Sequence, residues 1–196
     1  EAVKRVEAAL AYPVFVKPAN GGSSVGISKA HDAAELVESL KLAAKYDRKI
    51  LVEQGVNVRE IEISVLGNEQ PMVSVPGEIV ASNEFYDYKA KYIDNKSVSV
   101  IPADIPADIT AKIQALAVET YQALECEGFS RVDFFIDRDN GNIYLNEVNT
   151  LPGFTEISMY PKMWEAAGLS YDKLLAKLIE LAEERFADRA KNSIDC

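Results

Sequence analysis

The chain has 196 residues, of which 48% are hydrophobic and 27% are charged, as in ordinary globular proteins. Its formal net charge of −10 at pH 7 argues against a nucleic-acid or anionic-membrane surface, because both need a basic patch. The sequence contains no apolar run near the ~20 residues of a membrane span and no signal-peptide pattern. Two cysteines provide no disulfide framework, so we expect a cytoplasmic protein. Because the sequence starts without methionine, we also expect a fragment.

The first part of the chain predicts two short strands and one helix, and the sequence enters the first strand almost at once. Tyr12–Pro18 and Ile50–Glu53 are brief runs of β-branched, aromatic and other apolar residues, which is typical of strands. Asp32 and Glu35 have the spacing of a capping box, so we expect a helix to begin there. The apolar positions on one face of this helix are Leu36, Val37, Leu40, Ala43 and Ala44.

The rest of the chain predicts mostly antiparallel hairpins with two more helices. Arg59–Leu66 alternates polar and apolar residues strictly, which indicates a strand with one buried face. Next we expect a strand over Pro71–Val80 with a break near Pro76, a functional loop over Ser82–Val98 and a helix over Asp108–Leu124. Two strands, over Arg131–Asp137 and Asn142–Asn149, should follow around an Asn140-Gly141 turn. A helix over Ser170–Ala190 should close the fold, with its inward face formed by Tyr171, Leu174, Leu175, Leu178, Leu181 and Ala182. The pattern favours an α+β or α/β fold.

Three oxygen-bearing side chains lie on the last two predicted strands. Asp133 belongs to the first of these strands, and Glu147 and Asn149 belong to the second. Carboxylate and amide oxygens without sulfur or imidazole suit a hard cation such as Mg²⁺, which shares its remaining coordination positions with phosphate and water. A magnesium–nucleotide site is therefore the first hypothesis, and a hairpin with polar residues on its solvent face is the alternative.

The shared site imposes a condition on this hairpin. Glu147 and Asn149 are two apart on one strand and therefore point to the same face. A two-residue Asn-Gly turn in regular register would set Asp133 opposite Val148, on the wrong face. We therefore expect an odd loop of three or five residues around Arg138–Asn142, which would bring Asp133 to the face of Glu147 and Asn149.

Further segments have the residues of a binding site but also an ordinary structural interpretation. The loop Gly21–Gly26 could cradle phosphate with backbone N–H groups, or it could simply connect two elements. Glu53 and Glu60 could accept hydrogen bonds from a base or a ribose, or they could be solvated. The turn around Gly153 could present a backbone N–H to negative charge, and the aromatic, basic segment Phe85–Tyr92 could be a lid or a surface patch.

Several segments together resemble one enzyme family. They are FVKPANGGSSVGISK, EQGVNVREIE, EFYDYKAKY, SRVDFFID and YLNEVNTLPGFTEISMYP, in this order. From about Tyr12 to Phe186 the chain resembles the D-alanine–D-alanine ligases of the ATP-grasp superfamily. The resemblance implies an α+β ATP-grasp fold with part of the central subdomain in residues 1–54 and a C-terminal domain in residues 55–187, in which helices flank an antiparallel sheet. We expect residues 188–196 to be a disordered tail.

The resemblance also implies an activity, the ATP-dependent joining of two D-alanines for peptidoglycan precursors. The carboxylate of the first D-alanine attacks the γ-phosphate to give an acyl phosphate, and the amine of the second then displaces phosphate. The implied cofactors are ATP and two Mg²⁺ ions, which Mn²⁺ could replace; the implied partners are D-alanine and a second copy in a homodimer, with no nucleic acid and no membrane. Because the family's N-terminal domain is not in this sequence, we expect the chain to be inactive alone.

Positions that match the family's motifs imply a role for each site residue. Lys17, Ser23, Ser24 and Gly26 would contact the ATP phosphates, and Glu53, Gln54, Val56 and Glu60 would line the adenine and ribose pocket, although Gln54 stands where many relatives have lysine. Asp133, Glu147 and Asn149 would hold the ions. Arg131 and the Gly153 N–H would form the oxyanion hole, Ser158 would hold the carboxylate of the second D-alanine, and Lys91 and Tyr92 would lie on a lid, with Tyr92 hydrogen-bonded toward Ser23.

Two alternatives remain open, besides a different ATP-grasp carboxylate–amine ligase, which shares the metal residues but not the lid and the PGFT segment. The first is a related ligase that joins D-alanine to D-lactate or D-serine. The Lys91-Tyr92 pair resembles the dipeptide-forming enzymes, because the lactate-forming enzymes of vancomycin resistance lack this lid tyrosine. The second alternative is a non-catalytic nucleotide-binding fragment.

Overall fold

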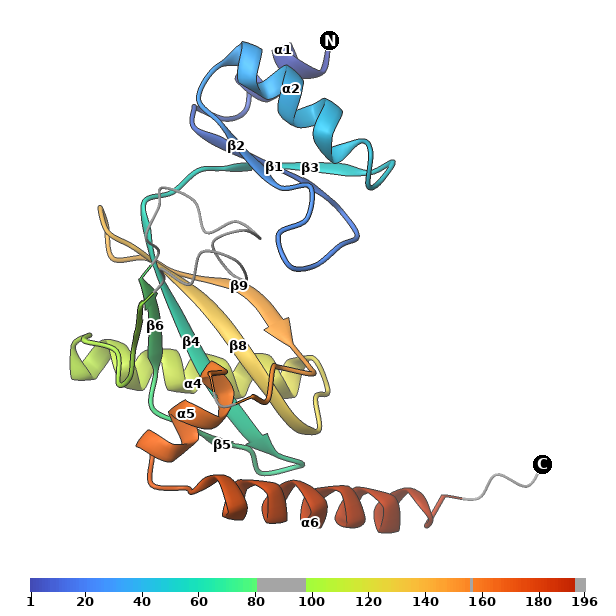
Figure 1. Ribbon diagram of the computed structural model, residues 1–196, viewed down its shortest axis with the longest axis vertical. Helices are drawn as coiled ribbons and strands as arrows, with labels where there is room; N and C mark the ends of the chain where they lie inside the picture. The colour runs from blue at the N-terminus through green and yellow to red at the C-terminus, as the bar shows by residue number, and fades with distance from the viewer. Residues whose placement is uncertain (81–97, 156, 193–196) are drawn as a thin grey trace. The chain divides into compact units, whose positions relative to one another are not determined.

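The computed structural model describes residues 1–80, 98–155 and 157–192 and divides the chain into two compact units. The N-terminal unit contains Glu1–Asn57, and the C-terminal unit contains Val58–Val80 and the described chain from Ser99 onward (Figure 1). The predicted loop over Ser82–Val98 lies outside the described residues except for Val98. Among the described residues, no helix has the length and apolar character needed to cross a membrane.

The N-terminal unit is a small antiparallel sheet with helices on one face. Its elements are α1 (Ala2–Glu7), β1 (Val14–Pro18), β2 (Ser28–Ala30), α2 (Ala33–Ala43) and β3 (Ile50–Gln54), and the strand order is β2-β1-β3. Val14 and Val16 of β1 are fully buried with Leu36 of α2, because alternate residues of the strand point toward the helix. The opposite face of β1 carries Phe15 and Lys17.

The predicted start of α2 is confirmed, and two other details of this unit are corrected. Asp32 is the N-cap, and its Oδ1 accepts hydrogen bonds from Ala34 N (2.8 Å) and Glu35 N (2.9 Å). Ser39 is buried on the inner face whereas Val37 is exposed, because the helix is rotated slightly from the predicted face. Helix α1 was not predicted, since Ala2–Glu7 is short and has no side-chain cap.

The C-terminal unit is an antiparallel sheet between helices, which confirms the α+β class. Its strands are β4 (Val58–Gly67), β5 (Met72–Val73), β6 (Gly77–Val80), β7 (Val98–Val100), β8 (Gly128–Asp137) and β9 (Ile143–Asn149). Its helices are α4 (Ala107–Ala123), α5 (Met159–Ala166) and α6 (Tyr171–Arg189). The strand order is β7-β6-β4-β8-β9, and β5 pairs with β4.

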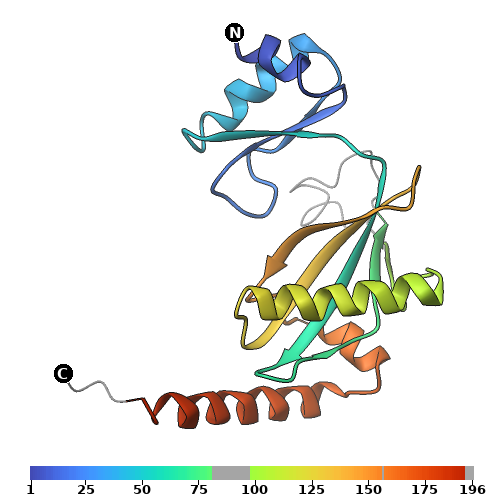
Figure 2. The same ribbon diagram turned by 180° about the vertical axis from the view of Figure 1, so that it is seen from behind.

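The two faces of this sheet are covered differently. Helix α4 crosses the face that carries Ile61, Ile63 and Phe134, and it lies in front of the sheet in Figure 2. Helices α5 and α6 cover only part of the other face, where Leu66 is buried with Tyr160 and other residues of the two helices. The strict alternation in β4 explains this division, because odd-numbered residues point to α4 and even-numbered residues point away from it.

Two expectations at the C-terminal end of the chain are corrected. The segment Met159–Ala166 forms α5, which was not predicted because Pro161 and the preceding Pro152-Gly153 turn obscured its helical period. Helix α6 continues through Arg189, so the expected tail does not begin at residue 188. Leu174 and Leu181 are buried as expected, whereas Tyr171 and Leu175 are 47% and 41% exposed.

We expect Tyr121→Phe to destabilise the C-terminal unit. The fully buried Tyr121 hydroxyl donates to Gly67 O at 2.7 Å, where β4 ends. Without this donor the Gly67 carbonyl loses a buried hydrogen bond, which costs about 1–2 kcal/mol of the free energy of unfolding. Urea unfolding followed by circular dichroism measures the change. The control, Tyr144→Phe on β9, removes a hydroxyl from a 42% exposed side chain and should change stability by less than about 0.5 kcal/mol; equal effects of the two substitutions would contradict this account.

Candidate functional site

A β-bulge in the β8–β9 hairpin sets which side chains share a face. Near the loop, Ile136 pairs with Ile143 and Phe134 pairs with Leu145. The register then shifts between Asp133 and Phe134, so that Asp133 pairs with Glu147. Asn146 is therefore the extra residue on β9. Residues directly opposite each other on antiparallel strands point to the same face, so the expected shared face of Asp133 and Glu147 is confirmed.

The odd loop that we expected for this hairpin is wrong. Asp137 N donates to Asn142 O at 2.9 Å, so the loop consists of the even set Arg138–Gly141. The buried carboxylate of Asp137 stabilises this loop, because it accepts hydrogen bonds from Asp139 N (2.8 Å) and from Asn140 Nδ2 (2.7 Å). With an even loop and regular pairing, Asp133 would lie opposite Asn146, and Glu147 would point to the other face. The bulge supplies the missing residue instead.

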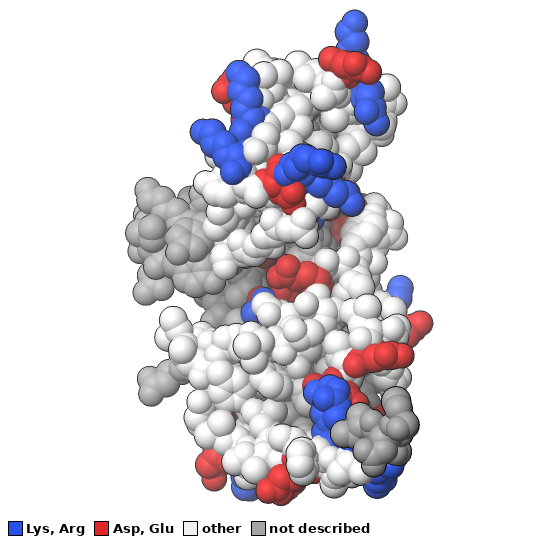
Figure 3. Space-filling view, turned by 90° about the vertical axis from the view of Figure 1, so that its right-hand side faces the viewer, with Lys and Arg blue, Asp and Glu red and all other residues white. Residues whose placement is uncertain are grey.

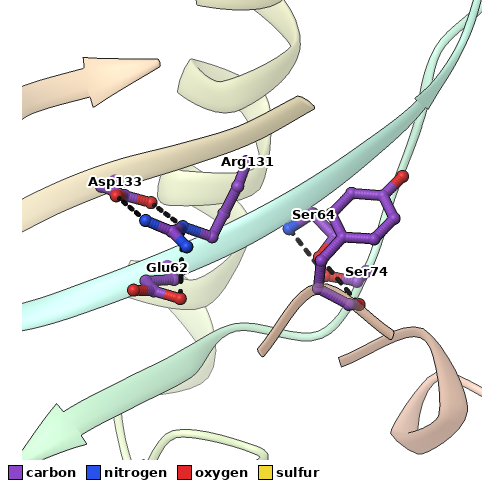
Figure 4. Close-up of polar contacts among 6 residues, drawn as sticks. Glu62, Ser64, Ser74, Arg131 and Asp133 are labelled. Atoms are coloured by element: carbon purple, nitrogen blue, oxygen red, sulfur yellow. Dashed lines mark hydrogen bonds and ion pairs between the residues drawn. The ribbon is translucent and has the colours of Figure 1, made fainter. Parts of the chain in front are cut away.

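Arg131 lies between two carboxylates on this face. Its Nε donates to Asp133 Oδ1 and its terminal nitrogen to Asp133 Oδ2, each at 2.7 Å, and Glu62 Oε2 is 3.3 Å from its Nε (Figure 4). Glu62 pairs directly with Asp133 in the β4–β8 register, which explains why both side chains reach the same guanidinium. Burial by itself would lower the pKa of Arg131, but the hydrogen bonds to Asp133 and the charge of Glu62 outweigh it and raise the pKa.

The expected cation ligands share the face but are not gathered around an ion. Glu147 is exposed and Asn149 is half-buried opposite Arg131, while both oxygens of Asp133 already accept hydrogen bonds from Arg131. No group of three or more His, Cys, Asp or Glu side chains in the described part of the chain could hold a metal ion as it stands. The donor set of carboxylates and an amide fits a hard cation such as magnesium. Its use as a cation site therefore remains a prediction that requires Asp133 to change partners.

Gly153 and Ser158 lie together just before α5. A Cβ atom at Gly153 would lie 3.0 Å from Ser158 Oγ, so the two predicted residues are neighbours and the position favours glycine. Thr155 N donates to Ser158 Oγ at 3.0 Å, and Ser158 N donates to Thr155 O at 2.9 Å. This compact turn holds a hydroxyl beside the Gly153 backbone at the N-terminal end of α5.

Two buried hydrogen bonds fix α5 on β4. The Tyr160 hydroxyl donates to Val65 O at 2.9 Å, and Ser64 Oγ donates to Tyr160 O at 3.1 Å. Ser74 Oγ in turn accepts from Ser64 N at 3.0 Å (Figure 4). Because Ser64 and Glu62 lie on the same face of β4, one strand positions both the turn before α5 and the carboxylate beside Arg131.

The N-terminal unit places Lys17 and Glu53 together on the face of its sheet opposite α2. Lys17 Nζ is 2.7 Å from Glu53 Oε1, and Phe15, which pairs with Glu53, lies on the same face. Lys29 Nζ lies 5.9 Å from the centre of the Phe15 ring. In the view of Figure 3, basic and acidic side chains occur in small mixed groups. Local cations such as these, and not the net charge of the chain, would govern binding of an anion.

The glycine and serine loop after β1 has the backbone of a tight turn. Ser23 and Ser24 have φ of 53° and 59°, and Gly26 has φ of 76°. Val25 N donates to Gly22 O at 3.1 Å. A Cβ at Gly26 would lie 2.5 Å from the Tyr46 ring, so this position requires glycine both for its backbone conformation and for space.

Other predicted site residues are not all brought together. Gln54 lies on the face opposite Glu53, and its side chain accepts from Ala11 N (3.0 Å) and donates to Ala11 O (2.9 Å), so any ligand contact on the Glu53 face would have to come from its backbone. Val56 is 37% exposed after β3, and Glu60 lies on β4 in the C-terminal unit. Lys91 and Tyr92 lie outside the described residues. Glu62 was not predicted as a site residue, although the alternation of β4 had already put it on the face of Glu60.

Comparison with known proteins identifies the family of the chain. The sequence profile of the family described as D-ala D-ala ligase C-terminus matches residues 1–180. The D-alanine--D-alanine ligase of Acetivibrio thermocellus is 55% identical to this chain, and the match covers 96% of this chain and 50% of the relative. The D-alanine--D-alanine ligase of Clostridium acetobutylicum is 57% identical, and the match covers 94% of this chain and 54% of the relative. The chain therefore spans about half the length of the curated relatives it matches.

Solved structures give the same result. The D-alanine-D-alanine ligase from Coxiella burnetii has a TM-score of 0.82 and 37% identity, with 97% of this chain and 50% of that chain covered. The VanG D-Ala:D-Ser ligase from Enterococcus faecalis has a TM-score of 0.83 and 44% identity, with 92% and 52% covered. These neighbours support the expected α+β ATP-grasp fold. The chain belongs to the D-alanine–D-alanine ligase family, whose C-terminal region it matches.

Proposed function

We propose that this chain supplies the nucleotide-binding and catalytic half of an ATP-dependent ligase that joins two D-alanines through an acyl phosphate. The product would be D-alanyl-D-alanine, a precursor of peptidoglycan. The observation that carries the proposal is the bulged hairpin, which puts Arg131, Asp133 and Glu147 on one face in a chain of the ligase family. An acyl phosphate is made from a triphosphate and a carboxylate, and such a phosphoryl transfer is assisted by bound cations and cationic side chains. Side chains such as Asp133 and Glu147 can hold a cation, and Arg131 is itself a cation.

In the C-terminal unit, Asp133, Glu147 and Asn149 would hold two Mg²⁺ ions, with Mn²⁺ as a substitute. When bound, these ions would neutralise phosphate charge. Arg131 and the Gly153 N–H would donate to the oxyanion that develops when the second D-alanine attacks. The Ser158 hydroxyl, 2.9 Å from Thr155 Oγ1 and beside Gly153, would bind the carboxylate of that D-alanine.

In the N-terminal unit, the face of the sheet opposite α2 would bind the nucleotide. The phosphate contacts would come from Lys17, Ser23, Ser24 and Gly26, and the base and ribose contacts from Glu53, Val56 and the backbone of Gln54. The family resemblance also implies a ribose contact for Glu60, which lies on β4. Lys91 and Tyr92, predicted from sequence alone, would belong to a lid that shields the acyl phosphate from water. We expect the enzyme to act in the cytoplasm as a homodimer. The ion pair between Lys17 and Glu53 would open when phosphate replaces the carboxylate as the partner of the lysine.

A second candidate is a ligase that accepts D-serine, because the VanG D-Ala:D-Ser ligase is 44% identical over 92% of this chain. Competition between D-alanine and D-serine in one reaction, with the products separated by chromatography, distinguishes the two. A dominant D-alanyl-D-serine product would replace the proposed substrate. D-lactate in a parallel reaction tests the third acceptor. Release of phosphate by the isolated 196 residues at the rate of an intact ligase would contradict their expected inactivity alone.

We expect Glu147→Gln to lower turnover of the complete ligase without unfolding it. Glu147 is exposed and accepts no hydrogen bond from the described residues, so the amide costs little stability but removes one negative charge from the proposed cation site. Loss of a cation ligand should reduce kcat by at least the roughly 10–100-fold typical of outer-shell partners. Coupled-enzyme assays and thermal unfolding measure the two effects. Glu119→Gln on α4 is the control for the same charge change; a Glu147→Gln enzyme with full activity would rule out the cation role.

We expect Gly26→Ala to weaken ATP binding more than Gly22→Ala does. A methyl group at residue 26 would meet the Tyr46 ring in a left-handed backbone conformation, whereas a Cβ at Gly22 meets no atom within 4 Å. The distorted loop should raise the KM for ATP several-fold, because strain of this kind is on the order of 1–3 kcal/mol. Steady-state kinetics with varied ATP and saturating D-alanine give the comparison. Equal KM values for the two variants would show that the loop does not contribute to the nucleotide site.

A further inference from the structure

Arg131 has a second carboxylate that the roles proposed above do not use. Glu62 Oε2 lies 3.3 Å from Arg131 Nε, and the side chains of Glu62 and Arg131 are only 13% and 19% exposed. The contact is longer than the 2.7 Å bonds from Arg131 to Asp133. In this structure Asp133 is therefore the main partner of the guanidinium, and Glu62 is a second, more distant acidic neighbour (Figure 4).

Binding of a cation by Asp133 would change the balance between these two partners of Arg131. An ion held by Asp133 would draw one or both of its oxygens away from Arg131 and would also repel the guanidinium. A largely buried guanidinium that loses its carboxylate is strongly unfavourable unless another acceptor replaces it. Arg131 would then either resist the ion or leave the position in which it can donate to the developing oxyanion.

We propose that Glu62 is a positioning residue that retains Arg131 when Asp133 turns to the cation. This proposal rests on the proposed function, because it needs an ion on Asp133. Glu62 is directly opposite Asp133 in the strand register, so Arg131 can pass from one carboxylate to the other by a small rotation of its planar group. The exchange leaves the guanidinium paired and oriented throughout, and it lets the ion compete for Asp133.

A second ion pair on the same strand shows what a purely structural role looks like. Arg59 on β4 donates to both oxygens of Glu78, at 2.8 and 2.5 Å, on the face of the sheet that α4 covers. Its guanidinium also donates to Asp104 O at 2.9 Å. Both oxygens of Glu78 are therefore bonded to Arg59, and none of the proposed cation ligands lies on this face of the sheet. Glu78 is therefore a matched control for Glu62.

The test measures Mn²⁺ binding to the complete ligase through the paramagnetic resonance signal of free Mn²⁺, without other substrates. We expect Glu62→Gln to weaken Mn²⁺ binding about tenfold, the scale of one charge-assisted hydrogen bond. Glu62→Asp should weaken it comparably, since its carboxylate keeps the charge but is one methylene further from Arg131. Glu78→Gln should lower the unfolding temperature and leave Mn²⁺ affinity within twofold of the wild type.

Each result bears on a different claim. Wild-type affinity in Glu62→Asp together with weak binding in Glu62→Gln would show that only long-range charge matters, and would overturn the exchange of partners. Wild-type affinity in both variants would also overturn it, while leaving the cation site intact. If the wild-type ligase itself binds no Mn²⁺, the cation site of the proposed function is wrong, and the role of Glu62 falls with it. A loss of affinity in Glu78→Gln equal to that in Glu62→Gln would reduce Glu62 to a structural residue.

Discussion

The bulge at Asn146 is the constraint on which the arrangement of the C-terminal unit depends, because side chains on a strand alternate between two faces. With this even loop and no bulge, Asp133 would pair with Asn146, and Glu147 would point to the opposite face of the sheet. The bulge also lets Ile143 near the loop and Val148 beyond it both pack against the core. One inserted residue thus allows β9 to keep an apolar face toward α4 and, on the other side, a polar face that Glu147 shares with Asp133.

Among the described residues of the C-terminal unit, the helices on the polar side of the sheet pack only at one end of it, around Leu66. Tyr160 and Ser64 hold α5 against β4, and Ser64 pairs with Arg131 in the strand register, so the helix that follows the Gly153–Ser158 turn is anchored on the strand that carries Glu62. Residues far apart in the sequence are therefore organised by one rigid strand. Sites supported by strands and buried hydrogen bonds hold their geometry more closely than sites on free loops.

Charge is balanced locally in this acidic protein. Arg131 is surrounded by acids on three strands, and Lys17 and Glu53 neutralise each other on the sheet of the N-terminal unit. In each pair the cation could exchange its acidic partner for another anion. Lys17 could exchange Glu53 for a phosphate, and Arg131 could exchange Asp133 for a second carboxylate. Exchange of partners lets a binding site keep buried or half-buried cations satisfied before its ligands arrive.

Most strands and long helices were predictable from local signals, namely the period-two and helical patterns, the Asp32 cap and the family motifs. The grouping of Glu147 with Asn149 was predictable too, because residues two apart on a strand share a face. The tertiary structure alone decided how Asp133 joins them, since a bulge depends on how two strands pack against a common core and not on a recognisable local motif. It likewise decided the place of Glu62, whose partner across the sheet comes from a strand more than sixty residues further along the chain.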